Sequence, residues 1–139
     1  MSTNGLLALG DVRARCAAAL APAQPDDPNV FAGFVDALDP PSLLLMWGTP
    51  WVEPQTMVSG MASRRGYWDA NLTVLMIAGR LEPGTGVDEL ERLVAYTFAR
   101  LAADTYQWPV PSSTPPRPWS VGGVNYLGAT LDYRVPVTI

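Results

Sequence analysis

The sequence predicts an α+β fold, a mostly antiparallel sheet of four to five strands with two helices packed on one face. Two segments repeat their apolar residues at helical spacing, and five others have the alternation, the apolar run or the aromatic content that is typical of strands. The elements follow the order helix, strands, helix, strands. A length of 139 residues suits one domain, so we expect residues 1–139 to form a single unit.

The two helices are predicted from apolar spacing and from residues that end a helix. The first is expected between Leu6 and Leu20, with Cys16 on its apolar stripe and Pro22 as its stop. The second is expected over 87–103. Its apolar face is predicted to comprise Val87, Leu90, Val94 and Leu101, with Leu93 widening it.

Strands are predicted over 30–35, 42–47, 65–79, 119–127 and 128–138. The run Ser42-Leu43-Leu44-Leu45-Met46-Trp47 is continuously apolar after its serine, which suits a strand buried on both faces. The segment 65–79 is the longest candidate. It places Ala70, Leu72, Val74 and Met76 on one face. The intervening residues lie on the other face and are polar near the start of the strand.

The charge composition argues against several classes of partner. The chain has nine Arg, no Lys and no His, and its formal net charge is −4. An acidic chain lacks the positive charge that general affinity for nucleic acid or anionic lipid requires. It has a single cysteine, no basic leader and no apolar stretch of about 20 residues. We therefore expect a soluble protein without a disulfide, a signal peptide or a membrane partner.

The same composition removes most catalytic chemistry. Without His or Lys, the common nucleophile–base, Schiff-base and zinc arrangements are excluded, so we predict no enzyme, no catalytic residue, no metal site and no cofactor. Cys16 is expected to be a core residue. The pairs Asp26/Asp27 and Asp36/Asp39 lie beside prolines and are expected to shape loops, with an oxygen-ligated cation as the alternative.

Candidate interface residues are aromatic, sulfur-containing and basic. Trp51, Trp108 and Trp119 each lie in or beside a Pro-containing loop, where an aromatic ring either packs beneath the loop or contacts a partner. Four further candidates lie between the end of the second predicted strand and the first residue of the third. Met57 and Met61 add apolar surface there, and Arg64 and Arg65 either form a solvated pair or contact an acidic partner or a phosphate.

A Pro-rich segment, 104–119, separates the second helix from the closing strands. Five prolines remove backbone donors and favour extended geometry, so this loop either docks as an arm on a neighbouring molecule or folds flat over its own sheet. In the arm alternative, Trp108 is accessible in the free subunit. In the alternative in which the segment folds flat over its own sheet, Trp108 and Trp119 are both buried beneath this connector.

This layout resembles that of the tail terminator proteins of siphophages, especially those infecting actinobacteria. The resemblance rests on an Ala/Leu-rich first helix, the strand Pro40-Pro41-Ser42-Leu43-Leu44-Leu45, and a long strand opened by aromatics, Tyr67-Trp68-Asp69-Ala70-Asn71-Leu72-Thr73-Val74. A Gly-containing turn, a helix and two closing strands complete it. The likeness spans nearly the whole chain and concerns layout, not an invariant motif.

The resemblance implies a structural virion protein at the tail-neck junction, assembled in the host cytoplasm. The chain would form a homohexameric ring that caps the tail tube, contacts the major tail tube protein and meets the head-tail connector or stopper. DNA would pass through the ring without specific binding, which an acidic lumen favours. Two alternatives remain open: another neck component, such as a stopper or minor joining protein, and a cytosolic small-molecule-binding module whose pocket is lined by 49–63.

Overall fold

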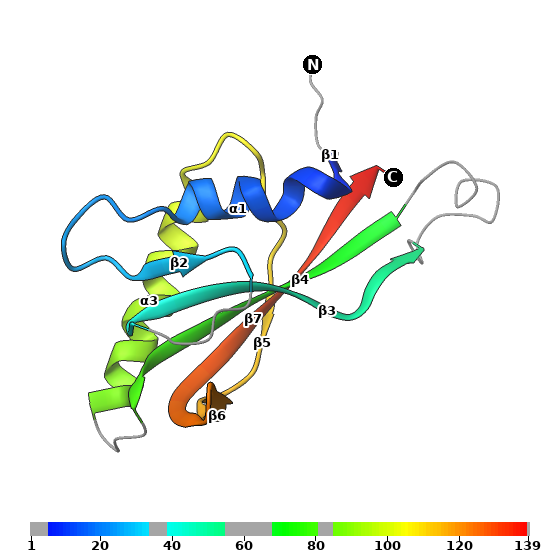
Figure 1. The fold of residues 1–139 in the computed structure, drawn as a ribbon. Helices are drawn as coiled ribbons and strands as arrows, with labels where there is room; N and C mark the ends of the chain where they lie inside the picture. Colours follow the sequence, from blue (N-terminus) through cyan, green and yellow to red (C-terminus); the bar gives the residue numbers. More distant parts are fainter. Residues whose placement is uncertain (1–5, 34–38, 55–67, 81–84, 139) are drawn as a thin grey trace.

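The computed structural model describes residues 6–33, 39–54, 68–80 and 85–138 (Figure 1). They form a curled mixed sheet with two α-helices. The elements are β1 (Leu7–Ala8), the 3₁₀ turn η1 (Leu9–Asp11), α1 (Val12–Leu20), β2 (Asn29–Phe31), β3 (Ser42–Pro54), β4 (Trp68–Arg80), α3 (Thr85–Ala102), β5 (Ser112–Ser113), β6 (Arg117–Val121) and β7 (Val124–Thr138).

The sheet has the strand order β1-β7-β4-β3-β2, and β5 and β6 also pair with β7. The pairs β3–β4, β4–β7, β5–β7 and β6–β7 are antiparallel, whereas β1–β7 and β2–β3 are parallel. The α+β class is therefore confirmed, but the sheet is mixed and has seven strands among the described residues instead of four to five. The extra strands β1 and β5 have two residues each, too short to leave a pattern in the sequence.

One face of the sheet carries both helices, as the sequence predicts (Figure 1). Alternate residues of the central strands face the helices, so β4 contributes every second side chain to this core. The alternation predicted for the long strand is confirmed. The main core contains Val12, Cys16 and Leu20 from α1, Leu90, Leu93 and Leu101 from α3, and Leu43, Leu45, Ala70, Leu72, Val74, Met76, Leu131, Tyr133, Val135 and Val137 from the strands.

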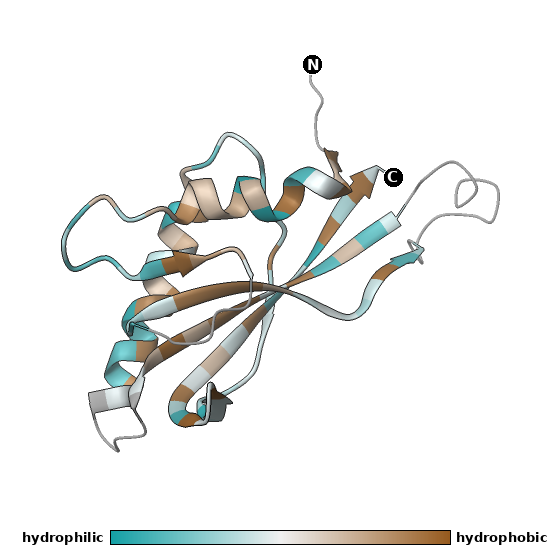
Figure 2. Ribbon diagram, in the orientation of Figure 1, coloured by the Kyte–Doolittle hydropathy of each residue, from teal (hydrophilic) through white to brown (hydrophobic). Residues whose placement is uncertain are grey.

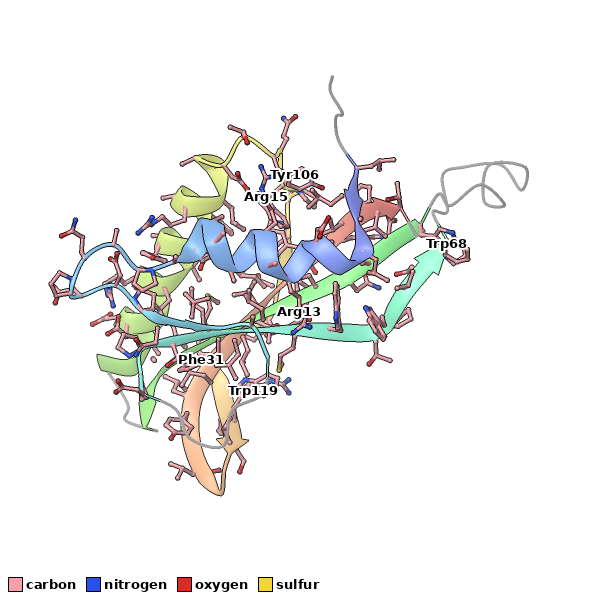
Figure 3. The ribbon with its side chains drawn as sticks, turned by 45° about the horizontal axis from the view of Figure 1, so that its top comes forward. Arg13, Arg15, Phe31, Trp68, Tyr106 and Trp119 are labelled. Atoms are coloured by element: carbon pink, nitrogen blue, oxygen red, sulfur yellow. The ribbon has the colours of Figure 1, made fainter. Side chains whose placement is uncertain are left out.

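The other face of the sheet is apolar at one end only. A small cluster of Leu44, Leu75, Ile77 and Tyr126 is covered by partly buried Phe31 and Trp119, because β6 and the start of β7 curl over it (Figure 3). Toward the start of β4 the strand contains more hydrophilic residues (Figure 2), and on this face Asp69 is in register with Glu53 and Thr73 with Asp132. Of the run 42–47 predicted to be buried on both faces, Ser42–Leu45 is buried, whereas Met46 and Trp47 are only partly buried. β3 then continues beyond Trp47 to Pro54.

Two predicted boundaries at the start of the chain are wrong. The first α-helix begins at Val12, not near Leu6, because Leu7 and Ala8 pair in parallel with the end of β7. It ends at Leu20, two residues before Pro22 as expected. The strand predicted over 30–35 is the shorter β2, and residues 34–38 lie outside the described residues.

The predicted apolar face of the second helix is rotated from the observed one. Leu90, Leu93 and Leu101 are buried, but Val87 is 39% exposed. The first turn presents Gly86 to the sheet instead, since a Cβ there would lie 2.6 Å from Leu127 Cδ2. This glycine lets α3 approach β7 closely, and Val87 is left on a side of the helix that faces solvent.

The closing hairpin turns earlier than predicted. Gly122 and Gly123 form the two-residue turn between β6 and β7, with φ angles of 59° and 80° that favour glycine. The predicted boundary between Leu127 and Gly128 instead lies inside β7.

None of the helices in the described part of the chain is long and apolar enough to cross a membrane.

Gly128→Ala is expected to destabilise the fold by about 1–3 kcal/mol. A Cβ at this position would lie 2.8 Å from Trp119 Cδ1 and 3.0 Å from the backbone oxygen of Met76, which cannot move without disturbing β4. The matched control is Gly10→Ala, because a Cβ there meets no atom within 4 Å. Urea unfolding of both variants measures the difference, and equal midpoints would contradict the predicted crowding.

Candidate interaction surfaces

The exposed Trp51 marks the first candidate surface. Its side chain is 53% exposed, and its ring lies 5.6 Å from that of Trp47 at a tilt of 32°. The sequence places Trp51 in a loop, but the structure places it in β3, after the register shift between Trp47 and Val52. A large exposed aromatic ring on a strand is typical of a protein interface.

The two rings line a hollow of about 390 Å³ between η1, α1 and β3. Arg13 links these elements, since its Nη1 donates a hydrogen bond to the backbone oxygen of Ala32 and its guanidinium lies 6.0 Å from the Trp47 ring centroid. We call this site the tryptophan hollow. It is lined by Leu9, Gly10, Arg13, Ala32, Trp47 and Trp51.

Four predicted interface residues fall outside the described residues. Met57, Met61, Arg64 and Arg65 lie in 55–67, so their roles stay predictions. The unpatterned segment 49–63 is only partly described: it continues β3 to Pro54. There Asn71 Nδ2 donates to the backbone oxygen of Pro50 at 2.8 Å and holds the strand against β4.

Trp108 lies against its own subunit. Its ring makes edge contacts with Tyr106 and Tyr133, at centroid distances of 4.8 and 6.4 Å, and it is partly buried. Its Nε1 donates to Asp104 Oδ2 at 2.9 Å. In the described chain, 104–119 runs beside β7 as the connector alternative requires. Docking of this segment on a neighbour stays a prediction.

Asp104 fixes the start of this connector. Arg15 Nε and Nη2 donate to its two carboxylate oxygens at 3.1 and 3.0 Å, a fork between α1 and the end of α3 (Figure 3). These hydrogen bonds from Arg15, with a smaller contribution from Trp108, hold the pKa of the Asp104 carboxyl below its usual value although partial burial opposes the shift. The pair joins positions 89 residues apart.

Asp104→Asn is expected to destabilise the protein near neutral pH and less so in acid. The Asp104 pKa is lower in the folded chain than its unfolded value of about 3.9, so its contribution is complete above that pH and is lost as pH falls through the folded pKa. Urea unfolding of both proteins at pH 7 and at decreasing pH below about 4 measures the difference. A difference independent of pH would contradict this assignment.

A second hollow, of about 620 Å³, opens between the end of α3 and the connector. Trp108, Tyr106 and Tyr133 form its inner wall. Its rim is apolar and open to solvent, with Phe98 46% exposed and Val110 92% exposed. Neither rim residue was predicted from the sequence, although the position of Val110 between Pro109 and Pro111 is a visible signal of an extended, exposed segment.

Trp119 is mainly a structural residue in this chain. It is partly buried over the small second core, and the Arg117 guanidinium lies 4.3 Å from its ring centroid. Its indole Nε1 is buried and has no hydrogen-bond partner among the described residues. Its predicted interface role stays untested, but its ring already covers Leu75 and Ile77.

The hydrophilic end of the outer sheet face is dominated by carboxylates. Arg134 Nε donates to Asp69 Oδ2 at 2.7 Å, and its Nη2 lies 3.5 Å from Glu53 Oε1. Beside them, Thr73 Oγ1 donates to Asp132 Oδ1 at 2.7 Å. Asp69 is buried by this pairing, so the start of β4 is less solvated than the sequence suggests.

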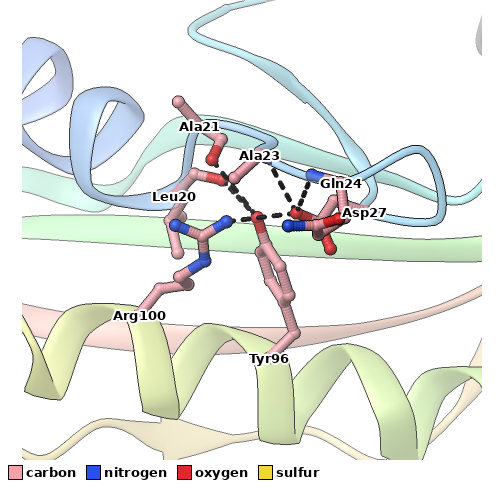
Figure 4. A network of polar contacts seen from close by, with 7 residues as sticks. All are labelled: Leu20, Ala21, Ala23, Gln24, Asp27, Tyr96 and Arg100. Atoms are coloured by element: carbon pink, nitrogen blue, oxygen red, sulfur yellow. Dashed lines mark hydrogen bonds and ion pairs between the residues drawn. The ribbon is translucent and has the colours of Figure 1, made fainter.

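A polar network ties the end of α1 to α3 (Figure 4). Asp27 accepts hydrogen bonds from the backbone N–H groups of Ala23 and Gln24, and from Arg100 Nη2 at 3.1 Å. These backbone hydrogen bonds, more than Arg100, lower the Asp27 pKa. Tyr96 donates its hydroxyl to the backbone oxygen of Leu20. The loop role expected for Asp27 is confirmed.

Cys16 is the core residue that the sequence predicts. It is fully buried in α1, and burial raises its thiol pKa to about 12. A thiol that stays protonated in an apolar core is a poor nucleophile.

Searches for similar proteins among family models and curated sequences found no match to this chain.

Proposed function

We propose that this protein is a structural subunit of a bacteriophage neck, a ring-forming tail terminator that caps the tail tube and meets the head-side connector. The sequence layout supports this assignment, and one structural observation carries it furthest. Trp51 is held half-exposed on Trp47 beside an open hollow, an arrangement suited to a protein contact. A contact that is not self-complementary closes copies of one chain into a ring when the rotation between neighbours allows it.

The outer sheet face supports the same proposal. Its open end carries Glu53 and Asp132 beside the buried Asp69, with Arg134 the neighbouring cation in the ion-pair network. Such a face, turned toward a channel, repels phosphates and lets DNA pass without binding. Tube protein and connector would then contact the two rims of the ring.

Another neck component, a stopper or minor joining protein, would use the same features in a different ring. A third candidate is a small-molecule-binding module, which the hollow beside Trp108 favours because its wall is aromatic. Against this, Asp104 already binds Arg15 and Trp108, so the charge that would orient a ligand is largely satisfied inside the subunit.

Deletion of the gene from its phage tests the proposal. Tails made without the protein should lack a ring at the head-proximal end and should fail to join heads, and supplying the protein should restore both. Electron microscopy of tails and the yield of infectious particles measure these effects. A ring found at the head side of the neck would identify a stopper. Absence of the protein from purified virions by mass spectrometry would contradict any neck function.

A further inference from the structure

Two unlike apolar surfaces lie on opposite sides of α1. The tryptophan hollow is concave and aromatic. The other surface is the exposed apolar rim of the second hollow, and we call it the proline loop: Pro109, Val110 and Pro111, with Phe98 beside it on α3. Val110 is the most exposed large apolar residue in the described chain.

The fold keeps these surfaces apart within one subunit. Trp47 on β3 is in register with Leu72 on β4, and Leu72 with Tyr133 on β7, so β4 separates the hollow from the strand that supports Trp108. Arg13 and Arg15 emerge from opposite sides of α1, Arg13 toward the hollow and Arg15 toward Asp104 (Figure 3). With α1 and β4 between them, the loop of one chain cannot reach its own hollow.

The two surfaces are chemically complementary. Aromatic-lined grooves bind Pro-containing extended segments, because such segments lose little entropy and their rings lie flat on indoles. Pro109 and Pro111 provide this chemistry in a stretch without regular secondary structure. Because proline has a carbonyl oxygen but no backbone N–H, the loop has more hydrogen-bond acceptors than donors. Arg13 in the hollow complements it, since its side chain has five N–H donors and no acceptor.

We propose that the proline loop of one copy docks in the tryptophan hollow of the next copy, with Val110 against Trp51. The inference rests on the proposed ring and names its subunit contact. Because a different surface is used on each partner, the association is head-to-tail and either closes into a ring or grows as a filament. Trp51 and Trp47 are the anchors, since aromatic residues dominate the energy of such contacts.

Cysteine cross-linking tests this contact directly. Gly10→Cys puts a thiol in the hollow without steric cost and leaves both tryptophans in place, and Val110→Cys puts one on the loop. The native Cys16 is buried, with a pKa of about 12, and does not compete. Equimolar mixing of the two single variants under mild oxidation should give a disulfide-linked dimer. The matched control pairs Val110→Cys with Val87→Cys, an exposed position outside both surfaces.

The mixed pair should form the disulfide at least about ten-fold faster than the control pair, and at least about ten-fold faster than the hollow variant alone or the loop variant alone. Separately, Trp51→Ala should weaken self-association at least about ten-fold without changing the thermal midpoint. A ring detected by mass with no excess of mixed cross-link would overturn this contact and leave the proposed function standing. Faster cross-linking of one variant with itself would indicate a two-fold contact and would also overturn it. Absence of association at any concentration would refute the contact, whereas the gene deletion decides the function separately.

Discussion

Leu90→Ala is expected to lower the free energy of unfolding by about 2–5 kcal/mol. Leu90 is 2% exposed, and it packs with Leu93 and Leu101 of α3 into the core above the sheet. Truncation would leave a cavity between two rigid elements that cannot close around it. Chemical unfolding followed by far-ultraviolet circular dichroism measures the change.

The control is Val87→Ala on the same helix. Val87 is exposed, so its truncation should change the free energy of unfolding by no more than about 0.5 kcal/mol. The two variants share backbone and helix, which isolates the effect of burial. Similar losses for both positions would show that the helix is rotated toward the face expected from sequence.

Trp108→Ala is expected to destabilise the monomer by roughly 2–4 kcal/mol, near the lower part of the range for a core tryptophan because the ring is only partly buried. The ring contacts Tyr106 and Tyr133, and its indole is one of the donors that stabilise the Asp104 carboxylate. Thermal and urea unfolding of the isolated subunit measure the loss.

Trp108→Phe separates the two contributions. It keeps an aromatic ring beside Tyr133 but removes the donor to Asp104, which Arg15 still binds. We expect a loss of about 1 kcal/mol from this variant. An alanine variant with an unchanged midpoint but impaired ring formation would instead support the arm alternative, in which Trp108 belongs to a contact between subunits.

The sequence predicts the elements whose pattern is set by burial. Leu43–Leu45 is apolar because both sheet faces are covered there, and Ala70 to Met76 alternates because only one face meets the helices along its whole length. On α3, Leu90, Leu93 and Leu101 lie on the core face as predicted, whereas Val87 does not and the buried Thr97 was missed. Its hydroxyl donates to the Leu93 backbone oxygen, so a polar residue occupies the apolar stripe and breaks the pattern.

The candidate surfaces were less predictable, since they depend on distant parts of the chain. Trp51 could be selected from its neighbourhood of prolines, although that neighbourhood proved to be a strand. The Arg15–Asp104 pair could not be foreseen, because no local pattern joins residues 89 positions apart. Likewise, Phe98 lies at a helix position compatible with either side, and the side that faces solvent follows from the burial of Leu90, Leu93 and Leu101.

The brevity of the outermost strands has a consequence for how the protein behaves when concentrated. The sheet ends in β1, with two residues, and in β2, with three, and Pro50 and Pro54 lack the N–H groups that would continue a ladder along β3. Another chain can add only a few backbone hydrogen bonds at these borders. Growth by strand addition, the route to amyloid, is therefore disfavoured at these two borders of the described sheet.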